Sequence, residues 1–192
     1  MPRAVEFDNA KVLESAMDLF WKKGYHATSM QDLTEATGLN RSSLYNTFGC
    51  KMQLYRTALT QYQKQNGSVF QKALIKAGNP REAIELIFEG FLRDIANDKE
   101  KKGCFNMNCK AEMSSDPAIR DWLSIQEEQH ISFFEGLISD AQERGLINER
   151  QGAREYAFYV FNTLQGLRMT GILIQDQKVL KAIVSATLRT LR

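Results

Sequence analysis

Several residue types and patterns are scarce in this sequence of 192 residues. It has only three prolines and three cysteines, and 43% of its residues are hydrophobic, which is typical of a compact, mostly helical protein. No run approaches the ~20 consecutive apolar residues that a bilayer-spanning helix needs. An odd number of cysteines argues against a secreted disulfide framework, and no basic stretch followed by an apolar one predicts a signal peptide. We therefore expect a cytoplasmic protein with reduced thiols.

Motifs for catalysis are also missing. The chain has only two histidines, so few residues are available for a histidine-based active site. It contains no glycine-rich phosphate loop, no metal-protease histidine pair and no nucleophile elbow. We therefore predict that the protein is not an enzyme and has neither a cofactor nor a resident metal ion.

Acidic residues are absent from Ala36 to Pro80, although the net charge of the whole chain is only +2. Charge confined to one segment suits a footprint for phosphate groups. The alternative is a solvated helix face that lacks acids. The cations of this stretch, which bring it to +6, are Arg41, Lys51, Arg56, Lys64, Lys72 and Lys76.

What the sequence does contain is a pair of short predicted helices between Thr28 and Lys51. Thr28 is expected to cap the first, with Gln31 completing a capping box, and Gly38 is placed to end it. Apolar residues at three-residue steps give this helix one inward face.

Asn40 is a suitable N-cap for the second short helix, Arg41 to Phe48. Leu44 and Phe48 are four residues apart and are predicted to point inward, which leaves the polar side chains outside. A short second helix with an outward polar face after a tight turn is the layout of a helix-turn-helix. Such a unit places its second helix in the major groove of DNA.

Residues 8 to 60 resemble the N-terminal DNA-binding domain of the TetR/AcrR family of bacterial transcriptional regulators. The resemblance is specific because many spacings hold at once, whereas the rest of the chain fits the family mainly in length and helical character. The resembling runs are Ala16-Met-Asp-Leu-Phe-Trp-Lys-Lys-Gly24-Tyr-His-Ala-Thr28-Ser and Gly38-Leu-Asn-Arg-Ser-Ser-Leu-Tyr45-Asn-Thr-Phe48-Gly-Cys-Lys51.

The predicted fold is all-α with about nine helices. A helix-turn-helix domain is expected over residues 1–50, after a short arm of residues 1–7, and a helical ligand-sensing and dimerisation domain over residues 51–192. Glycine, proline and capping residues set the expected boundaries. Besides the two short helices, the predicted helices cover residues 9–23, 51–77, 80–97, 103–114, 117–144, 151–174 and 178–190.

The start of the second short helix carries the residues expected to read DNA. Arginine can hold guanine through O6 and N7, asparagine can hold adenine, and serine reads either. The family resemblance implies base contacts at residues 40–43 and an aromatic ring against the DNA backbone at Tyr45, while Thr28 and Lys51 suit phosphate oxygens. Alternatively, Asn40 is only a cap, Ser43 is surface and Tyr45 is core. The predicted DNA-contacting residues are Thr28, Asn40, Arg41, Ser42, Ser43, Tyr45, Asn46 and Lys51.

Cys104 and Cys109 stand in the most distinctive motif outside this unit. Five positions along a helix are ~140° apart around its axis, so the two thiols cannot share one face. Three interpretations are open. The two cysteines are small core residues, or they form a thiol sensor in which Cys104 lies at a helix start among lysines. In the third, they form a soft-metal site to which Met107 or Met113 adds a ligand. The spacing is not a strong zinc signature. A Gly-Cys here is similar to electrophile-, oxidant- and copper-responsive members of the family.

If neither thiol senses anything, a small organic molecule is the expected effector. An apolar pocket with His130 or Asn108 as its polar anchor would hold it. The aromatic residues proposed to line that pocket are Phe88, Phe91, Phe105, Trp122, Phe133, Phe134 and Phe158.

The last two predicted helices are apolar on more than one side, wider than the stripe of an ordinary surface helix. A second copy of the chain is therefore expected to cover them, and the family resemblance implies the same homodimer.

The resulting hypothesis is a DNA-binding transcriptional regulator, by family resemblance a repressor, released from its operator by a small effector or by cysteine modification. The alternative is a helical module that binds another protein through the helix-turn-helix face. Salt dependence separates the two, because phosphate contacts release counterions.

Overall fold

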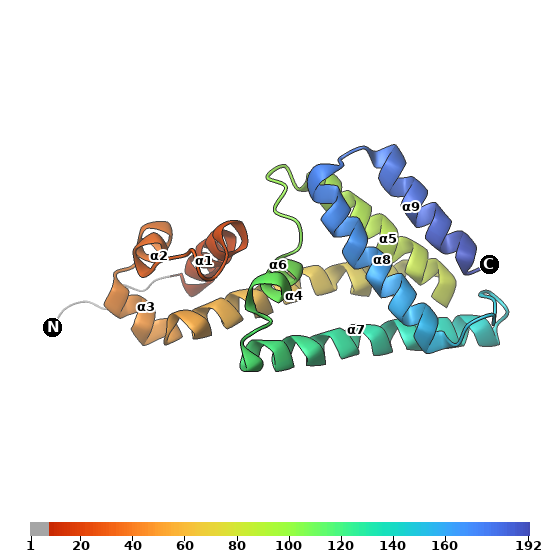
Figure 1. Cartoon of the computed structure of the whole chain (residues 1–192), viewed down its shortest axis with the longest axis horizontal. Coiled ribbons are helices and arrows are strands. Elements are labelled where there is room, and N and C mark those ends of the chain that lie inside the picture. Colours follow the sequence, from red (N-terminus) through yellow and green to blue (C-terminus); the bar gives the residue numbers. More distant parts are fainter. Residues whose placement is uncertain (1–7) are drawn as a thin grey trace.

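The computed structural model describes residues 8–192, which form nine α-helices and no strand (Figure 1). The all-α prediction is confirmed, and the expected arm of residues 1–7 lies outside the described residues. The helices are α1 (Asn9–Lys23), α2 (Met30–Thr37), α3 (Arg41–Phe48), α4 (Lys51–Lys76), α5 (Pro80–Asn97), α6 (Phe105–Met113), α7 (Pro117–Glu143), α8 (Ala153–Leu173) and α9 (Gln177–Thr190).

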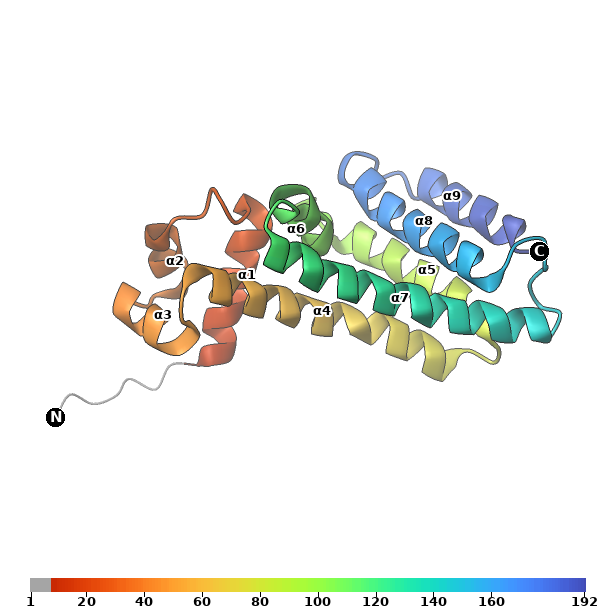
Figure 2. The same ribbon diagram turned by 60° about the horizontal axis from the view of Figure 1, so that its bottom comes forward.

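The elements are arranged along one long axis. Helices α1, α2 and α3 lie at one end, and α4 runs from that end into the other half of the molecule (Figures 1 and 2). Helix α7 runs from near α6, in the middle, to the other end, where α5, α8 and α9 lie. No helix within residues 8–192 combines the length and the apolar run that a membrane span requires.

Local capping explains most helix starts. The side chains of Asp8, Asn40 and Asn79 each accept hydrogen bonds from the first-turn amides of the helix that follows. Such a side chain satisfies an amide that has no partner within the helix. Pro80 and Pro117 occupy first helical positions, where their missing N–H costs nothing.

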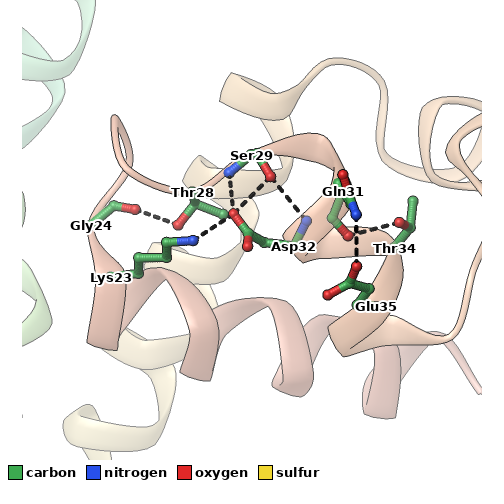
Figure 3. A network of polar contacts seen from close by, with 8 residues as sticks. All are labelled: Lys23, Gly24, Thr28, Ser29, Gln31, Asp32, Thr34 and Glu35. Carbon is green, nitrogen blue, oxygen red and sulfur yellow. Dashed lines mark hydrogen bonds and ion pairs between the residues drawn. The ribbon is translucent and has the colours of Figure 1, made fainter.

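The predicted cap of α2 is wrong by one residue. Ser29, not Thr28, is the N-cap, and it forms a capping box with Asp32 rather than with Gln31 (Figure 3). The Asp32 carboxylate accepts from the Ser29 amide at 2.7 Å, and the Ser29 hydroxyl accepts from the Asp32 amide at 3.0 Å. The Lys23 ammonium, 2.7 Å from the Asp32 carboxylate, and the hydrogen bonds that the Ser29 amide and hydroxyl donate to it hold the pKa of Asp32 well below its usual range.

Two apolar clusters form the interior. One joins α1–α3 and the first half of α4 to α6 and the start of α7, and the other joins the second half of α4 to α5, α7, α8 and α9. The predicted division between residues 50 and 51 falls at the N-terminus of α4. Helix α6 nevertheless packs with the N-terminal cluster. By its position in the sequence it lies in the predicted C-terminal domain, but its buried side chains contact the N-terminal helices.

Helices α8 and α9 keep apolar residues on their outer surface. Their inner stripes are buried, but Phe158 is 49% exposed, and Tyr159, Met169 and Val179 are also exposed. Apolar side chains on the solvent side of two neighbouring helices agree with the two-sided pattern in the sequence.

Candidate functional site

Helix α3 presents its polar side chains at one end of the molecule. Leu44 is buried on its inner side, and the helix packs against α2 and α4. The exposed residues of the helix and its cap are Asn40, Arg41, Ser42, Tyr45, Asn46 and Thr47, and Ser43 is half-buried. This is the surface that a helix-turn-helix places against the major groove.

Asn40 and Ser43 are joined by the cap of α3. The Asn40 side-chain oxygen accepts from the Ser43 amide at 2.8 Å, so this oxygen is already engaged in starting the helix. Capping is therefore one role of Asn40, and the predicted base contact would fall to its amide nitrogen.

Arg41 and Tyr45 lie one helical turn apart on the exposed side of α3. The Arg41 guanidinium carbon lies 5.8 Å from the centre of the Tyr45 ring, and Tyr45 is 39% exposed. Tyr45 is therefore a surface residue, not the core residue of the alternative interpretation. The ring supports the extended arginine side chain through a cation–π contact.

Replacing Arg41 by alanine is expected to cost about 1–3 kcal/mol of binding to one DNA sequence and to relax the preference at one base pair. Fluorescence anisotropy with single-base-pair variants of the preferred duplex measures both effects. Lys64→Ala, which removes an exposed cation further along α4, is the control and should leave the preference unchanged. Equal loss on every duplex would reduce Arg41 to a phosphate contact.

Thr28 and Lys51 flank the recognition unit and differ in what they offer to DNA. Thr28 is 1% exposed, and its hydroxyl donates to the Gly24 carbonyl at 2.6 Å, so the predicted hydroxyl–phosphate contact is wrong. Lys51 begins α4, and its ammonium lies 4.3 Å from the centre of the Tyr25 ring. Burial lowers the pKa of Lys51, against the opposing effect of Glu112 and Asp32.

The segment without acidic residues, Ala36 to Pro80, extends well beyond the end of the molecule that carries α3, which is called the reading end below. Arg41, Lys51 and Arg56 lie on α3 or the first turns of α4, whereas Lys76 ends α4, roughly 37 Å along the helix axis from Lys51. Only the first part of the stretch is placed to contact the same DNA as α3. The predicted footprint is thus shorter than the sequence pattern.

A cavity of about 90 Å³ lies between α4, α5, α6, α7 and α8. Phe91 is the only one of the seven predicted aromatic residues that lines it. Phe88, Phe105 and Phe134 are instead fully buried in the core, and Phe158 lies on the outer surface. The aromatic residues that the sequence did not single out for this cavity are Tyr62, Phe70 and Phe161.

His130, one of the two predicted polar anchors, lines this cavity. Its Nδ1 lies 2.7 Å from the Gln126 carbonyl oxygen, which only accepts, so Nδ1 carries the proton and Nε2 is left as an acceptor. The ring stacks on Phe161 with centroids 5.2 Å apart, and burial lowers the pKa of His130. Asn108, the other predicted anchor, donates to the Lys102 carbonyl at 3.2 Å and does not line the cavity.

The two cysteines of the motif lie in different surroundings. Cys104 is the N-cap of α6 and lines the cavity, beside the Tyr62 hydroxyl. Cys109 is fully buried against Tyr55, and burial raises the pKa of its thiol, against the lowering effect of the Tyr55 hydrogen bond. Cys109 therefore has the environment of a small core residue. The Cys104 thiol, in contrast, is accessible to a molecule that enters the cavity.

Helix α6 connects this cavity with the reading end. Asn106 and Met107 line the cavity. About one and a half turns further along α6, the Glu112 carboxylate accepts from the backbone amides of Tyr25 and His26 at 2.8 and 2.7 Å. These amides belong to the turn between α1 and α2. A second link is the Lys102 ammonium, 2.7 Å from the Asp18 carboxylate of α1. Direct contacts thus join α6 and the loop before it to the recognition unit.

Comparison with protein families matches both parts of the chain. Residues 12–58 match the family described as "Bacterial regulatory proteins, tetR family". Residues 80–187 match the "Tetracyclin repressor-like, C-terminal domain".

Known proteins similar to the chain include two regulators and one structure with DNA. The HTH-type transcriptional regulator YezE of Bacillus subtilis is 33% identical over 150 residues, 77% of each protein. The HTH-type transcriptional repressor ComR of Escherichia coli is 28% identical over 188 residues, 95% of this chain and 88% of ComR. A cysteine mutant of the TetR family regulator CifR, complexed with 26-bp double-strand operator DNA, superimposes with a TM-score of 0.86 at 29% identity, covering 99% of this chain and 100% of CifR.

Proposed function

The chain belongs to the TetR family of bacterial regulatory proteins, which are DNA-binding transcriptional regulators, and from that membership we propose that it is a cytoplasmic, homodimeric repressor released from its operator by a small effector. The observation that carries the proposal is the direct path from a cavity lined by α6 to the turn beside the reading helices. A cavity coupled in this way to a DNA-reading surface is what a ligand-controlled repressor requires.

DNA reading is assigned to the exposed side of α3. Arg41 reads a guanine, Asn40 and Ser42 contact neighbouring bases, and Tyr45 lies against the sugar-phosphate backbone. These roles follow from side-chain chemistry and from exposure on one surface. The similar regulator CifR is complexed with double-strand operator DNA, which supports double-stranded DNA as the partner here. ComR is named a repressor, which supports repression as the outcome.

The exposed apolar residues of α8 and α9 are proposed to join two copies of the chain. Burying Phe158 and its neighbours against a second copy removes apolar surface from water. A two-fold pair places two α3 helices on one face of the duplex, with half-sites about 34 Å apart or at a related spacing. A monomer at micromolar concentration in sedimentation equilibrium would contradict this pairing.

The effector is proposed to be a small, largely apolar molecule held among Phe70, Phe91 and Phe161. Its hydrogen-bonding group would donate to His130 Nε2, which the tautomer leaves as an acceptor. Since the cavity measures only about 90 Å³, a larger ligand must displace α6 or α7. Displacing α6 moves Glu112, and a ligand that prefers the displaced state shifts the population away from DNA.

Cys104 offers a second way to operate the same switch, because its half-buried thiol faces the effector cavity. Addition of this thiol to the electrophilic carbon of a carbonyl or activated alkene forms a carbon–sulfur bond and breaks the π bond, whose other atom takes the thiol proton. A bulky group is then left at the N-terminus of α6. Cys109 is not proposed as a sensor, because it is buried against Tyr55.

Cys104→Ser is expected to remove the loss of operator binding caused by diamide, methylglyoxal or Cu(I), with no change in binding by the reduced protein. The physical reason is that serine keeps the size of the residue but is neither a thiol nucleophile nor a soft-metal ligand. Titration of DNA affinity against each reagent measures the response, and Cys50→Ser, at the exposed cysteine, is the matched control. A mutant as sensitive as the wild type would exclude Cys104 as the sensor.

The proposed function is tested with reduced protein and DNA from upstream of its own gene, against a scrambled duplex of equal length. Specific binding that an apolar ligand abolishes supports the repressor. Binding with no preference over the scrambled duplex would contradict the assignment of α3 as the reading helix for that DNA.

A further inference from the structure

A second hollow, larger than the effector cavity, lies where the two domains meet. This interdomain cleft measures about 520 Å³ and is lined by Trp21 of α1, by α4 and α5, by the loop before α6, and by Arg168 and Gly171 of α8. Tyr62, Asn66 and Arg168 line both hollows, so this layer of side chains separates them. The proposed repressor mechanism does not use the interdomain cleft.

Arg168 is the most deeply placed charge of the cleft. It is 8% exposed, and its Nη1 donates to the Tyr62 hydroxyl at 2.9 Å, while its Nη2 donates to Asn66 at 3.0 Å and to Asp94 at 3.1 Å. All three partners line the cleft. Nε, in contrast, is buried and donates to no described residue.

Trp21 of α1 also lines the cleft and also has a buried N–H group without a partner in the part of the chain that the structure describes. Its indole ring lies 4.8 Å from the Tyr62 ring, centre to centre, and the Lys102 ammonium lies 4.5 Å from the indole centre. The indole Nε1 is also buried and donates to no described residue. Within residues 8–192, Trp21 Nε1 and Arg168 Nε are the two buried side-chain polar atoms without a hydrogen-bond partner, and both residues line this one cleft.

Buried N–H groups are nearly always paired in folded proteins, so two of them around one cleft indicate a ligand with acceptor oxygens. The lining contains four cationic side chains and three carboxylates, which favours an anion. The volume lies in the range of small-molecule sites, and the indole, Val69 and Ile95 offer apolar walls. We propose that the interdomain cleft binds a small di- or hydroxycarboxylic acid whose oxygens accept from Trp21 Nε1 and Arg168 Nε.

Such an acid connects the two domains, because Trp21 belongs to the DNA-binding end and Arg168 to the helix that lines the effector cavity. An acid held from both sides prefers one relative orientation of the domains. It therefore changes DNA affinity by linkage, and does so independently of the apolar effector. The cleft is a second input to the regulator.

Trp21 itself reports on the binding. The chain has two tryptophans, so Trp122→Phe leaves Trp21 as the only one. Succinate, malate and citrate are titrated into this variant without DNA, at constant pH and with ionic strength matched by sodium chloride. The expected result is a saturable change in Trp21 emission for at least one acid. No saturable change with any of the three acids overturns the proposal.

Two substitutions test the contacts. Arg168→Met, combined with Trp122→Phe, is expected to weaken binding at least tenfold, and Arg93→Met, an exposed arginine of α5 outside the cleft, is the matched control. Since Arg168→Met also removes the partner of Asp94 and can prevent folding, Trp21→Phe is the second test. It keeps an aromatic ring but removes the N–H donor together with part of the indole, and calorimetry should show weaker binding. Unchanged affinity in the folded variants would overturn the proposal.

Discussion

Replacing Phe105 by alanine is expected to lower the free energy of unfolding by about 3–5 kcal/mol. Phe105 is 1% exposed and is the first residue of α6. Its ring meets Tyr55 and Tyr62 edge-on, with centroids 5.5 and 5.7 Å away, and Trp21 at 6.3 Å. Removal of the ring leaves a cavity between α1, α4 and α6 that rigid neighbours close only in part, and it also removes the aromatic pair contacts.

Urea unfolding followed by circular dichroism measures this loss. Ile75→Ala is the control, because Ile75 is 87% exposed and its truncation should change stability by no more than about 0.5 kcal/mol. A loss below about 1 kcal/mol for Phe105→Ala would mean that α6 does not depend on this ring for its position. Other side chains would then have to hold α6 in the position in which it joins the cavity to Glu112.

Raising the salt concentration from about 50 to about 200 mM is expected to weaken operator binding roughly 10²-fold. Each reading end presents Lys51 and Arg56, on the first turns of α4, for phosphate contacts, whereas Arg41 is assigned to a base. A pair of ends therefore supplies four such cations, and each phosphate contact contributes about 0.9 to the slope of log affinity against log salt.

Anisotropy titrations over a salt series measure this slope. Lys51→Gln should reduce its magnitude by about two in the dimer, about one for each lost contact. Lys76→Gln is the control, because Lys76 ends α4, far from the reading end, and should leave the slope unchanged. Binding indifferent to salt would contradict phosphate contacts and favour a protein partner for the helix-turn-helix surface.

Sequence patterns predicted the helices well, because their boundaries depend on neighbouring residues. Gly38 has the left-handed backbone that ends α2, with φ of 70°, and the caps Asp8 and Asn40 act within their own first turns. The error at α2 shows the limit. Thr28–Gln31 and Ser29–Asp32 have the same capping-box spacing, and the buried bond from Thr28 to Gly24 decides between them.

The reading surface was also accessible to sequence reasoning, whereas the effector cavity was not. Polar residues around a buried Leu44 predict which side of α3 faces outward. Aromatic residues spread over α4, α5, α7 and α8 give no comparable signal, because packing between helices decides which rings are buried and which line a cavity. Phe134 became core, while Phe161 lines the cavity.

The sequence by itself determined the helix order, the exposed side of the reading helix and the two-sided character of α8 and α9, since all of these follow from periodicity and from contacts within a few residues. Only the tertiary structure placed α6 between the cavity and the reading end and surrounded Arg168 with Tyr62, Asn66 and Asp94. Arg168 is separated from these partners by 106, 102 and 74 positions. Contacts over such separations are set by how whole helices pack, which no local pattern records.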